Sequence, residues 1–435
     1  MSPHIDSFIE SGDAAAPPGQ TAAVSAARWW MKPFDPNGFS ARVGPVPFLA
    51  VATLSQTGMS FVQQGIVVMG VYFAALFRLT LAQMGLVTTA LSLGVMASMV
   101  VMGAVADRVG PRRLLFAGSG AMAALSLAFL WISGFYALLL LLFALGVVLA
   151  VAPASGTKAV FAAFRGRPRG MIMGIRQTGV PLGALLAASL LPRLVGGPEG
   201  LRPVFWLFAG ELLCLGWLFA GLMQGAPQPA VKATRNRLNV QVLGRIWRPA
   251  LIAVVMVSGQ YLLLGFSLSE LHRVHHVALA AAGLVLAASQ LGGGVGRILT
   301  GVISDRLGGR RTPVLMWCGL TAAVMSWVVA LLPPHVALWL LAVIWFVFGL
   351  GAVGWNALAM TWAGESVTPD RSGFAMSSVG TAAFLGSAVF PPLFGALVDA
   401  THQFSLGWAL LGGLLSLASF LSWRFGRSTE RLASQ

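Results

Sequence analysis

Long apolar stretches, separated by short segments rich in charged residues, glycine and proline, follow one another along most of this 435-residue chain. Each has the ~20 residues that an α-helix needs to cross the ~30 Å hydrocarbon core of a bilayer. The pattern predicts twelve such helices, in two sets of six. Their expected limits are 47–75, 81–106, 111–133, 136–164, 169–192, 202–223, 249–269, 280–304, 311–332, 335–363, 371–399 and 405–424.

The composition agrees with this pattern. Hydrophobic residues make up 57% of the chain and charged residues only 9%, whereas a soluble domain carries about 25% charged residues. We therefore expect an all-α integral membrane protein. Cys214 and Cys318 both lie in apolar stretches, so no disulfide framework is implied. No phosphate-binding loop or catalytic motif is present, and we expect neither enzymatic activity nor a cofactor.

The segments outside the apolar stretches define the expected domain organisation. Residues 1–43 contain Asp6, Glu10 and Pro17 and lack the apolar core of a signal peptide, so we expect a mainly disordered tail. The expected six-helix bundles are 44–223 and 249–424, joined by a basic linker over 224–248. Residues 425–435 form the expected C-terminal tail.

Basic residues are distributed asymmetrically between the two sides. If the N-terminus is cytoplasmic, the inner segments hold 21 of the 28 Lys and Arg residues. The outer loops hold only Arg78, Arg193, Arg202 and Arg273. This positive-inside bias predicts that both termini are cytoplasmic. We expect the membrane to be a bacterial inner membrane. The net charge of +15 is spread over the inner loops, so we expect no nucleic-acid partner.

One motif occurs twice. The pattern G-x-x-x-D-R-x-G-x-R-R begins at Gly103 and recurs 198 residues later from Gly301, each time between an even-numbered helix and the next one. The chain is thus a duplicated unit of six helices. An Asp at the C-terminal end of a helix is unfavourable unless a cation compensates it, so an Asp–Arg contact here suits a gate that opens and closes.

This doubled motif resembles the signature of the major facilitator superfamily, and the resemblance extends over residues 45–425. It implies a secondary active transporter with two six-helix halves that works by alternating access, and a monomer is expected. It also implies a conformational gate on the inner side that stabilises the outward-open state. The gate residues would be Asp107, Arg108, Arg112, Asp305, Arg306 and Arg310.

Few charges lie inside the predicted spans, where each is costly and calls for an explanation. Three are cations, Lys158, Arg176 and Arg297, and the one acid near a span centre is Glu211. Arg297 shares a polar or small helix face with Gln290, so we expect it to line a cavity. We expect the same of Arg176 and Lys158, although Lys158 could instead extend to the inner surface.

Uncharged polar residues also interrupt the spans. Gln56 and Gln63 lie on one face of the first helix, Gln260 and Tyr261 in the seventh, and Asn356 in the tenth. Together they predict a substrate cavity at mid-membrane between the halves. Each could equally form a helix–helix hydrogen bond.

A group of acid and histidine residues lies between the seventh and eighth helices. Glu270, His272, His275 and His276 resemble metal ligands at first sight, but no Cys accompanies them and Arg273 lies among them. We expect a solvated outer loop here and no metal site.

Three buried cations against one buried acid predict a small anionic substrate. Arg297, with Gly301 and Asp305 after it, resembles the anion-porter branch of the superfamily, which includes cyanate-permease-like, nitrate/nitrite and oxalate/formate carriers. The repeat position of Arg297 is occupied by Met99, so the paired arginines of nitrate carriers are missing and an organic carboxylate fits better. Proton coupling through Glu211 and anion exchange both remain open.

Two alternatives stay open. One is proton-coupled efflux of drugs or of neutral or cationic metabolites, although such proteins usually need a buried acid in the N-terminal half, where this chain has only Glu211. The other is a non-transporting membrane receptor or assembly protein, because a fold does not by itself establish a function.

Overall fold

The computed structural model describes residues 44–164, 169–196, 200–223, 240–368 and 371–433. Within these residues all regular structure is helical. Eleven helices are long and apolar enough to cross a membrane, and a twelfth span forms if the bent pair at the beginning of the chain counts as one. The all-α membrane architecture predicted from the sequence is therefore confirmed. The expected tail, residues 1–43, lies outside the described residues.

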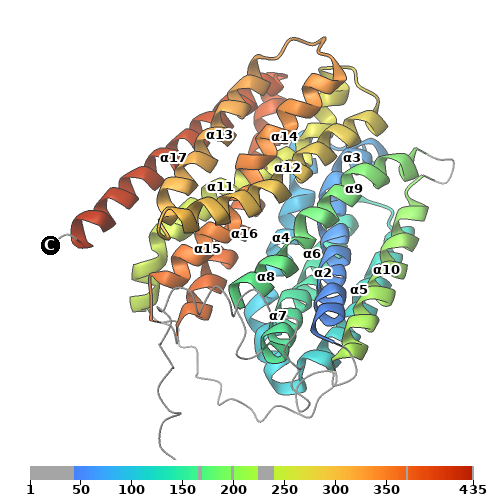
Figure 1. The fold of residues 1–435 in the computed structure, drawn as a ribbon. Coiled ribbons are helices and arrows are strands. Elements are labelled where there is room, and N and C mark those ends of the chain that lie inside the picture. The colour runs from blue at the N-terminus through green and yellow to red at the C-terminus, as the bar shows by residue number, and fades with distance from the viewer. Residues whose placement is uncertain (1–43, 165–168, 197–199, 224–239, 369–370, 434–435) are drawn as a thin grey trace, which may run out of the picture.

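The first half supplies six spans, drawn from blue to green in Figure 1. They are α2 (Pro45–Val68) with α3 (Gly70–Phe77), α4 (Leu81–Val109), α5 (Pro111–Ala128) with η2 (Phe129–Trp131), α6 (Phe135–Leu149) with α7 (Val151–Ala163), α8 (Arg169–Gln177) with α9 (Gly179–Val195), and α10 (Arg202–Leu222). Four of these spans consist of two helical segments. Such breaks expose backbone groups that a continuous helix would satisfy internally.

The second half supplies the other six spans, drawn from yellow to red in Figure 1. They are α11 (Val240–Arg273), α12 (Leu279–Arg306), α13 (Arg311–Leu331), α14 (Leu338–Gly354) with α15 (Asn356–Glu365), α16 (Ser372–Thr401) and α17 (Phe404–Ala433). Below, the side that carries the basic loops is called the inner side, and the opposite side the outer side.

Two expected limits differ from the structure. Helix α11 begins at Val240, inside the segment expected to be a linker, and α17 continues to Ala433, through most of the expected C-terminal tail. The expectations ended each helix where the apolar residues stop. A helix can continue past that point, because its backbone hydrogen bonds do not require apolar side chains.

The outer part of the seam between the halves is tightly packed where α4 meets α16. Gly85 of α4 lies directly against the backbone at Pro391, and Gly395 of α16 lies against the backbone of Leu81, with no room for a side chain at either glycine. The hydroxyl of Thr89 donates a hydrogen bond of 2.5 Å to the carbonyl of Ala388. Small residues here allow the two backbones to approach closely.

A carboxylate joins the halves at the outer end of this contact. Asp399 of α16 accepts hydrogen bonds from the backbone N–H groups of Leu81 (2.9 Å) and Ala82 (2.8 Å), in the first turn of α4. The N-terminus of a helix favours an anion because its first N–H groups lack partners within the helix. Thr80 and Gln83 complete this terminus as a capping box, as their spacing predicts.

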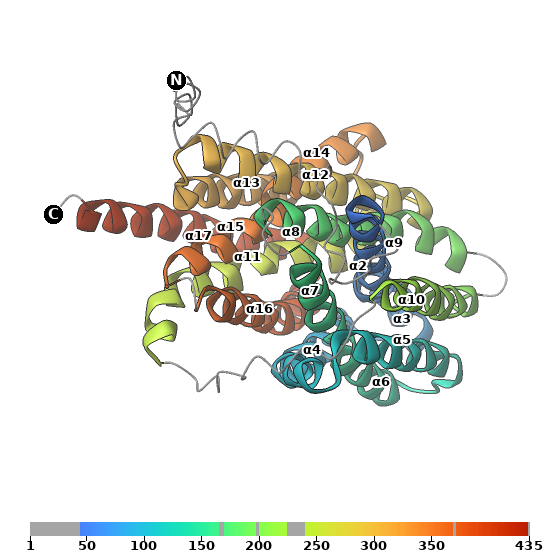
Figure 2. The same ribbon diagram turned by 60° about the horizontal axis from the view of Figure 1, so that its bottom comes forward.

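The tight contact between the halves is on the outer side. Toward the inner side, the contact of α4 with α16 continues to Thr381, whose hydroxyl lies 3.5 Å from the sulfur of Met99. Figure 2, turned to bring the inner loops forward, shows α7 and α8 of the first half facing the viewer on this side. The closest backbone packing and the Asp399 contact thus close the outer side.

We expect the Asp399 contact to hold the outer side closed. Replacing Asp399 by Ala removes charge-assisted hydrogen bonds, each of which contributes about 1.5–3 kcal/mol. In a Leu81→Cys reporter that also carries Cys214→Ser, the rate of thiol labelling from outside should rise roughly tenfold or more. Thr80→Ala is the matched control, because it removes a cap within α4 and leaves the contact between the halves intact. Equal labelling rates in Asp399→Ala and the reporter alone would contradict this role.

Candidate functional site

Arg297 bridges the two halves. This side chain of α12 is half-buried, and it donates hydrogen bonds of 3.3 Å from Nε to the carbonyl of Val353 and of 3.3 Å from Nη1 to the carbonyl of Gln177. Val353 belongs to the second half, whereas Gln177 ends α8 in the first half. Arg297 therefore contacts both halves, and its expected place in a cavity and its role in substrate binding stay predictions.

A proline explains why the Gln177 carbonyl is available. In a continuous helix this oxygen would accept from the N–H four residues later, but that residue is Pro181, which has no N–H. The helix breaks at Thr178, between α8 and α9, and the freed oxygen accepts from Arg297 instead. The Gly- and Pro-rich segment around Arg176 therefore creates an acceptor between the halves.

Arg176 lies in α8, one residue before this carbonyl. It is only 3% exposed, and its nearest acceptors are distant: the hydroxyl of Thr157 at 3.5 Å and the carbonyl of Ala152 at 3.5 Å. Its Nε has no hydrogen-bond partner. Gly156 leaves the space that the guanidinium occupies. Within the described residues neither Arg176 nor Arg297 forms an ion pair, so two guanidinium groups beside the seam lack a counter-ion.

Neutral polar side chains cross the seam between α2 and α11. The hydroxyl of Tyr261, which is 6% exposed, faces the side-chain amide of Gln64. Gln260 next to it is also buried, and its carbonyl oxygen has no partner among the described residues. The sequence analysis selected Gln63, which is half-buried, and missed Gln64, which is buried. Neighbouring positions on a helix point about 100° apart, so an error of one residue in the helix face changes which side chain reaches the seam.

The other predicted polar residues lie around this group. Gln56 donates to Ser60 one turn further along α2, at 3.2 Å, and its Cβ lies close to Gly179 of α9. Asn356 begins α15, directly after the break that follows α14, and is half-buried. Buried Trp355 forms the break itself and donates to the carbonyl of Ala352 at 3.0 Å.

Glu211 faces the interior of the first half. Its carboxylate lies against Gly58 of α2, where it would collide with any side chain, and neither oxygen has a hydrogen-bond partner among the described residues. It therefore does not point at the second half. Its proposed part in proton coupling stays a prediction.

Lys158 is placed with the inner gate rather than with the arginines. Its ammonium group lies 2.5 Å from the carboxylate of Asp107 and 2.7 Å from the carbonyl of Gly103. The salt bridge and the hydrogen bond both join α7 to α4, within the first half. Part of the Lys158 side chain, 36%, is exposed, so this cation has both a counter-ion and access to water.

The second copy of the motif forms a related cluster. Arg311 contacts Asp305 at 2.7 Å and Glu365 at 3.0 Å, which joins α12, α13 and α15 within the second half. The cation that meets Asp305 in this cluster is Arg311, which the expected gate residues did not include. Three of the other expected gate residues are exposed at the inner surface. They are Arg108, Arg112 and Arg306.

The expectation of a solvated outer loop is wrong for two residues. Glu270 is 2% exposed and His275 is 7% exposed, and their side chains approach to 4.0 Å. Of the four acid and histidine residues in this group, only His272 and His276 are exposed. The loop from Val274 folds back over the end of α11, which a polar sequence alone does not reveal. Among the described residues no three His, Cys, Asp or Glu side chains are arranged to hold a metal ion.

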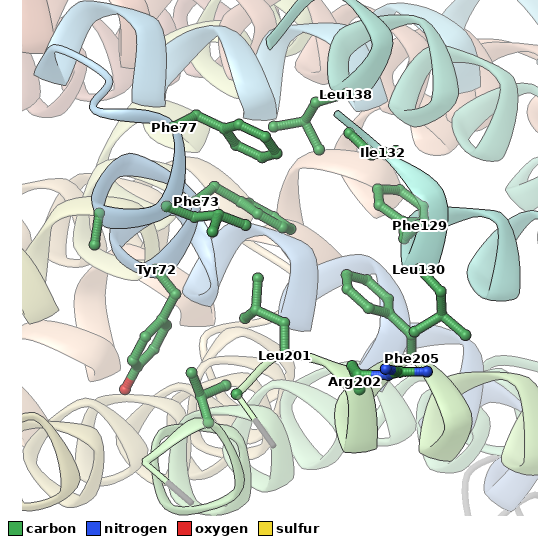
Figure 3. Close-up of a pocket in the computed structure, with 14 residues that line it drawn as sticks. Tyr72, Phe73, Phe77, Phe129, Leu130, Ile132, Leu138, Leu201, Arg202 and Phe205 are labelled. Atoms are coloured by element: carbon green, nitrogen blue, oxygen red, sulfur yellow. The ribbon is translucent and has the colours of Figure 1, made fainter. Parts of the chain in front are cut away.

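Two cavities lie elsewhere and are mainly apolar. The larger, about 570 Å³, is at the outer end of the first half between α3, η2, α9 and α10. Figure 3 shows Phe73, Phe129 and Phe205 around it and Arg202 at its margin. The smaller, about 280 Å³, is lined by residues of α11, α16 and α17 such as Leu262 and Phe394. Neither is lined by Arg176 or Arg297.

Two halves of six spans, a doubled charged motif and polar groups at the seam define a membrane transporter of the alternating-access class. Comparison with known families agrees. The model of the Major Facilitator Superfamily matches residues 49–333 and 250–434, and the chain belongs to this family.

Several proteins of known sequence are similar. An uncharacterised MFS-type transporter of Mycobacterium tuberculosis is 29% identical, covering 87% of this chain and 84% of that protein. The 3-(3-hydroxy-phenyl)propionate transporter of Escherichia coli is 28% identical, covering 67% and 72%. The gallate transporter of Pseudomonas putida is 25% identical, covering 79% and 82%.

Solved structures share the fold. A bacterial homologue of the human lysosomal transporter Spinster, in an inward-facing conformation, superposes with a TM-score of 0.74 at 16% identity, covering 88% of this chain and 97% of that one. The nucleoside transporter NupG superposes with a TM-score of 0.67 at 15% identity, covering 87% and 98%.

The Gln177 carbonyl, which Pro181 leaves without a partner in its own helix, leads to a prediction. Pro181→Ala restores the N–H that the Gln177 carbonyl lacks, so the oxygen should be satisfied within the helix and Arg297 should lose an acceptor. We expect an unchanged or higher unfolding temperature, because Pro costs about 3 kcal/mol relative to Ala inside a helix. We expect a several-fold lower initial rate of substrate uptake. Pro192→Ala is the matched control. The carbonyl that Pro192 leaves without a partner in its own helix, that of Ala188, lies against Gly283 and not against an arginine. A similar loss of uptake in both variants would show that helix flexibility and not Arg297 is responsible.

Proposed function

We propose that this protein is a secondary active transporter of a small organic anion, most specifically an aromatic carboxylate. The observation that carries the proposal is the pair of arginines beside the seam, Arg176 and Arg297, which have backbone or hydroxyl acceptors and no carboxylate partner among the described residues. A cation kept inside a membrane protein without a counter-ion is costly and is typical of a functional site.

An anion offsets this cost better than the present acceptors do. Hydrogen bonds between a guanidinium and a carboxylate are roughly twice as strong as those between neutral groups, and they can form in parallel pairs. The Arg297 contacts to neutral carbonyls, at 3.3 Å, are long. They position the guanidinium without neutralising it, so a carboxylate entering the seam gains most of the electrostatic attraction.

Aromatic character of the substrate is supported by the surroundings and by two relatives. Tyr261 and Trp355 are buried aromatic residues of the second half, and the carbonyl oxygens of Gln64 and Gln260 have no partner among the described residues, so they can accept from a phenolic hydroxyl. Two of the similar proteins are named for 3-(3-hydroxy-phenyl)propionate and gallate, both of which are hydroxylated aromatic carboxylates. We assign the same chemical class to this chain.

Alternating access would exchange two sets of contacts. The outer side is held closed by Asp399 on the first turn of α4, while the inner salt bridges Lys158–Asp107 and Arg311–Asp305 each lie within one half. In the opposite state, we propose that Arg108, Arg112, Arg306 and Arg310 close the inner side across the seam. We further propose a monomer in a bacterial inner membrane with both termini cytoplasmic, where basic loops favour the cytoplasmic surface.

A ligand-induced thermal shift on the detergent-purified protein tests the substrate class. The compounds are hydroxylated aromatic acids, aliphatic mono- and dicarboxylates, inorganic anions and organic cations. A ligand at 100 times its Kd adds ~2.7 kcal/mol to the folded state, so a substrate should raise the unfolding temperature measurably. We expect aromatic carboxylates to do so in the wild type and not in Arg297→Gln.

Arg306→Gln is the matched control, because it removes an exposed guanidinium from the same helix. It should keep the shift. Stabilisation by organic cations or neutral compounds, unchanged in Arg297→Gln, would contradict the anion proposal and favour the efflux alternative. Uptake of a radiolabelled aromatic acid into proteoliposomes then separates a transporter from a receptor.

A further inference from the structure

A buried carboxyl–imidazole pair lies at the outer end of the second half, far along α11 from the seam polar groups. Glu270 is in the last turn of α11, and His275 is in the loop that leads to α12. Their side chains are 3% and 1% exposed, and Nε2 of His275 lies 4.0 Å from Oε1 of Glu270. The other oxygen of Glu270 and Nε2 itself have no hydrogen-bond partner among the described residues.

The tautomer of His275 follows from its other contact. Nδ1 lies 3.1 Å from the carbonyl oxygen of Pro334. A carbonyl can only accept, so Nδ1 must carry a proton. In neutral His275 the Nε2 atom therefore presents a lone pair toward Glu270, and only in the charged form does it present an N–H.

This arrangement calls for one proton between the two groups. With none, a buried carboxylate faces an imidazole lone pair, and Nε2 has no donor, which is costly in a dry site. With one, the group that carries the proton turns a donor toward an acceptor, either a carboxylic acid toward Nε2 or an imidazolium toward the carboxylate. A second proton would produce an imidazolium beside a neutral acid, with a buried charge uncompensated. The pair is thus a site for one proton.

The surroundings favour the neutral form of the histidine. Burial lowers the pKa of His275, and the nearby His276 lowers it further, whereas the carbonyls of Pro334 and Pro333 act in the opposite direction. Glu270 lies at the C-terminal end of α11, where a negative charge is unfavourable. The indole N–H of Trp408 in α17 faces this carboxyl group and favours its charged form, but burial disfavours a charge there more strongly. On balance we place the shared proton on Glu270.

Solvent has access to the neighbourhood of the pair. The titratable or charged groups around it are His272, Arg273 and His276 beside it in the chain, and His335 in the loop before α14. All four are exposed, and the rings of His276 and His335 lie 6.4 Å apart. Trp408 of α17 faces Glu270, and Trp345 of α14 donates a hydrogen bond to Ser267, about one turn before Glu270. Neither tryptophan titrates. Exposed imidazoles can pass protons between water and the buried site.

The pair is also connected to the outer seam. Ser269, the residue before Glu270, contacts the sulfur of Met84 in α4 at 3.7 Å. Met84 is in the same first turns of α4 as Leu81 and Ala82, which bind Asp399. A change in protonation at the end of α11 thus acts beside the contact that closes the outer side.

We propose that Glu270 and His275 form a one-proton binding site on the outer side, and that substrate uptake depends on its occupation. The second part rests on the proposed transport of an organic anion. The carboxylate of Glu270 takes up a proton from outside and becomes a carboxylic acid that faces Nε2 of His275; loss of the proton restores the carboxylate. No other reactant is required.

Proton binding is measured without any substrate. A pH-difference infrared spectrum of the purified protein should show the C=O stretch of a protonated carboxyl group that disappears in Glu270→Gln. In His275→Gln the midpoint of this band should shift, because the imidazole partner is lost. His276→Gln is the matched control and should leave the midpoint in place. A band unaffected by Glu270→Gln would overturn the proton site.

The dependence of uptake is measured in proteoliposomes over a range of external pH, with the same aromatic acid for all variants. Wild-type uptake should fall with rising pH along a single-proton titration curve. Glu270→Gln imitates the protonated form and should give uptake that is largely independent of pH. Glu211→Gln tests the other buried acid: if Glu270 is the site that uptake depends on, this variant keeps the pH dependence that Glu270→Gln loses.

A wild-type profile in Glu270→Gln, or a flat one in Glu211→Gln alone, would overturn the assignment. Absence of uptake in the wild type, with the infrared band intact, would contradict the proposed function and the uptake dependence while the proton site stands. The two failures are therefore distinguishable.

Discussion

The contact between the two halves depends on backbone carbonyls that have no hydrogen-bond partner in their own helix, because a proline lies four residues later. In a membrane every backbone polar group must find a partner inside the protein, and an internal proline leaves the carbonyl four residues earlier without one. Three such carbonyls face the opposite half. They belong to Gln177, Ala188 and Ala388, which precede Pro181, Pro192 and Pro392 by four residues, and they meet Arg297, Gly283 and Thr89 respectively.

This constraint determines the character of the seam. Two of the freed carbonyls accept side-chain donors from the other half, and the third lies against a glycine with no room for a side chain. These contacts are polar, local and made by neutral acceptors, so they can be exchanged for others at modest cost. Bonds of this kind suit an interface that opens and closes in each transport cycle better than continuous apolar packing does.

Charge is used differently on the two sides. On the inner side the carboxylates of Asp107 and Asp305 meet cations from their own half. On the outer side Asp399 meets the N-terminal amides of a helix in the other half. Between them lie the guanidinium groups of Arg176 and Arg297, which carbonyls and a hydroxyl orient and which form no ion pair among the described residues. The proposed anion would enter between these two sets of contacts.

The sequence by itself determined the apolar spans, the duplication and which cations lie inside the spans, because apolar length, a repeat at fixed spacing and an intramembrane charge are all local patterns. That Arg297 contacts both halves came from the structure. Only the tertiary structure decided which partners meet. Lys158 joins Asp107, Arg311 joins Glu365, and Gln64 rather than Gln63 faces Tyr261. The sequence predicts a solvated loop at Glu270 and His275, but the loop folds back over the end of α11 and buries both side chains. Such contacts depend on helix rotation and on packing between distant segments, which periodicity along one chain does not encode.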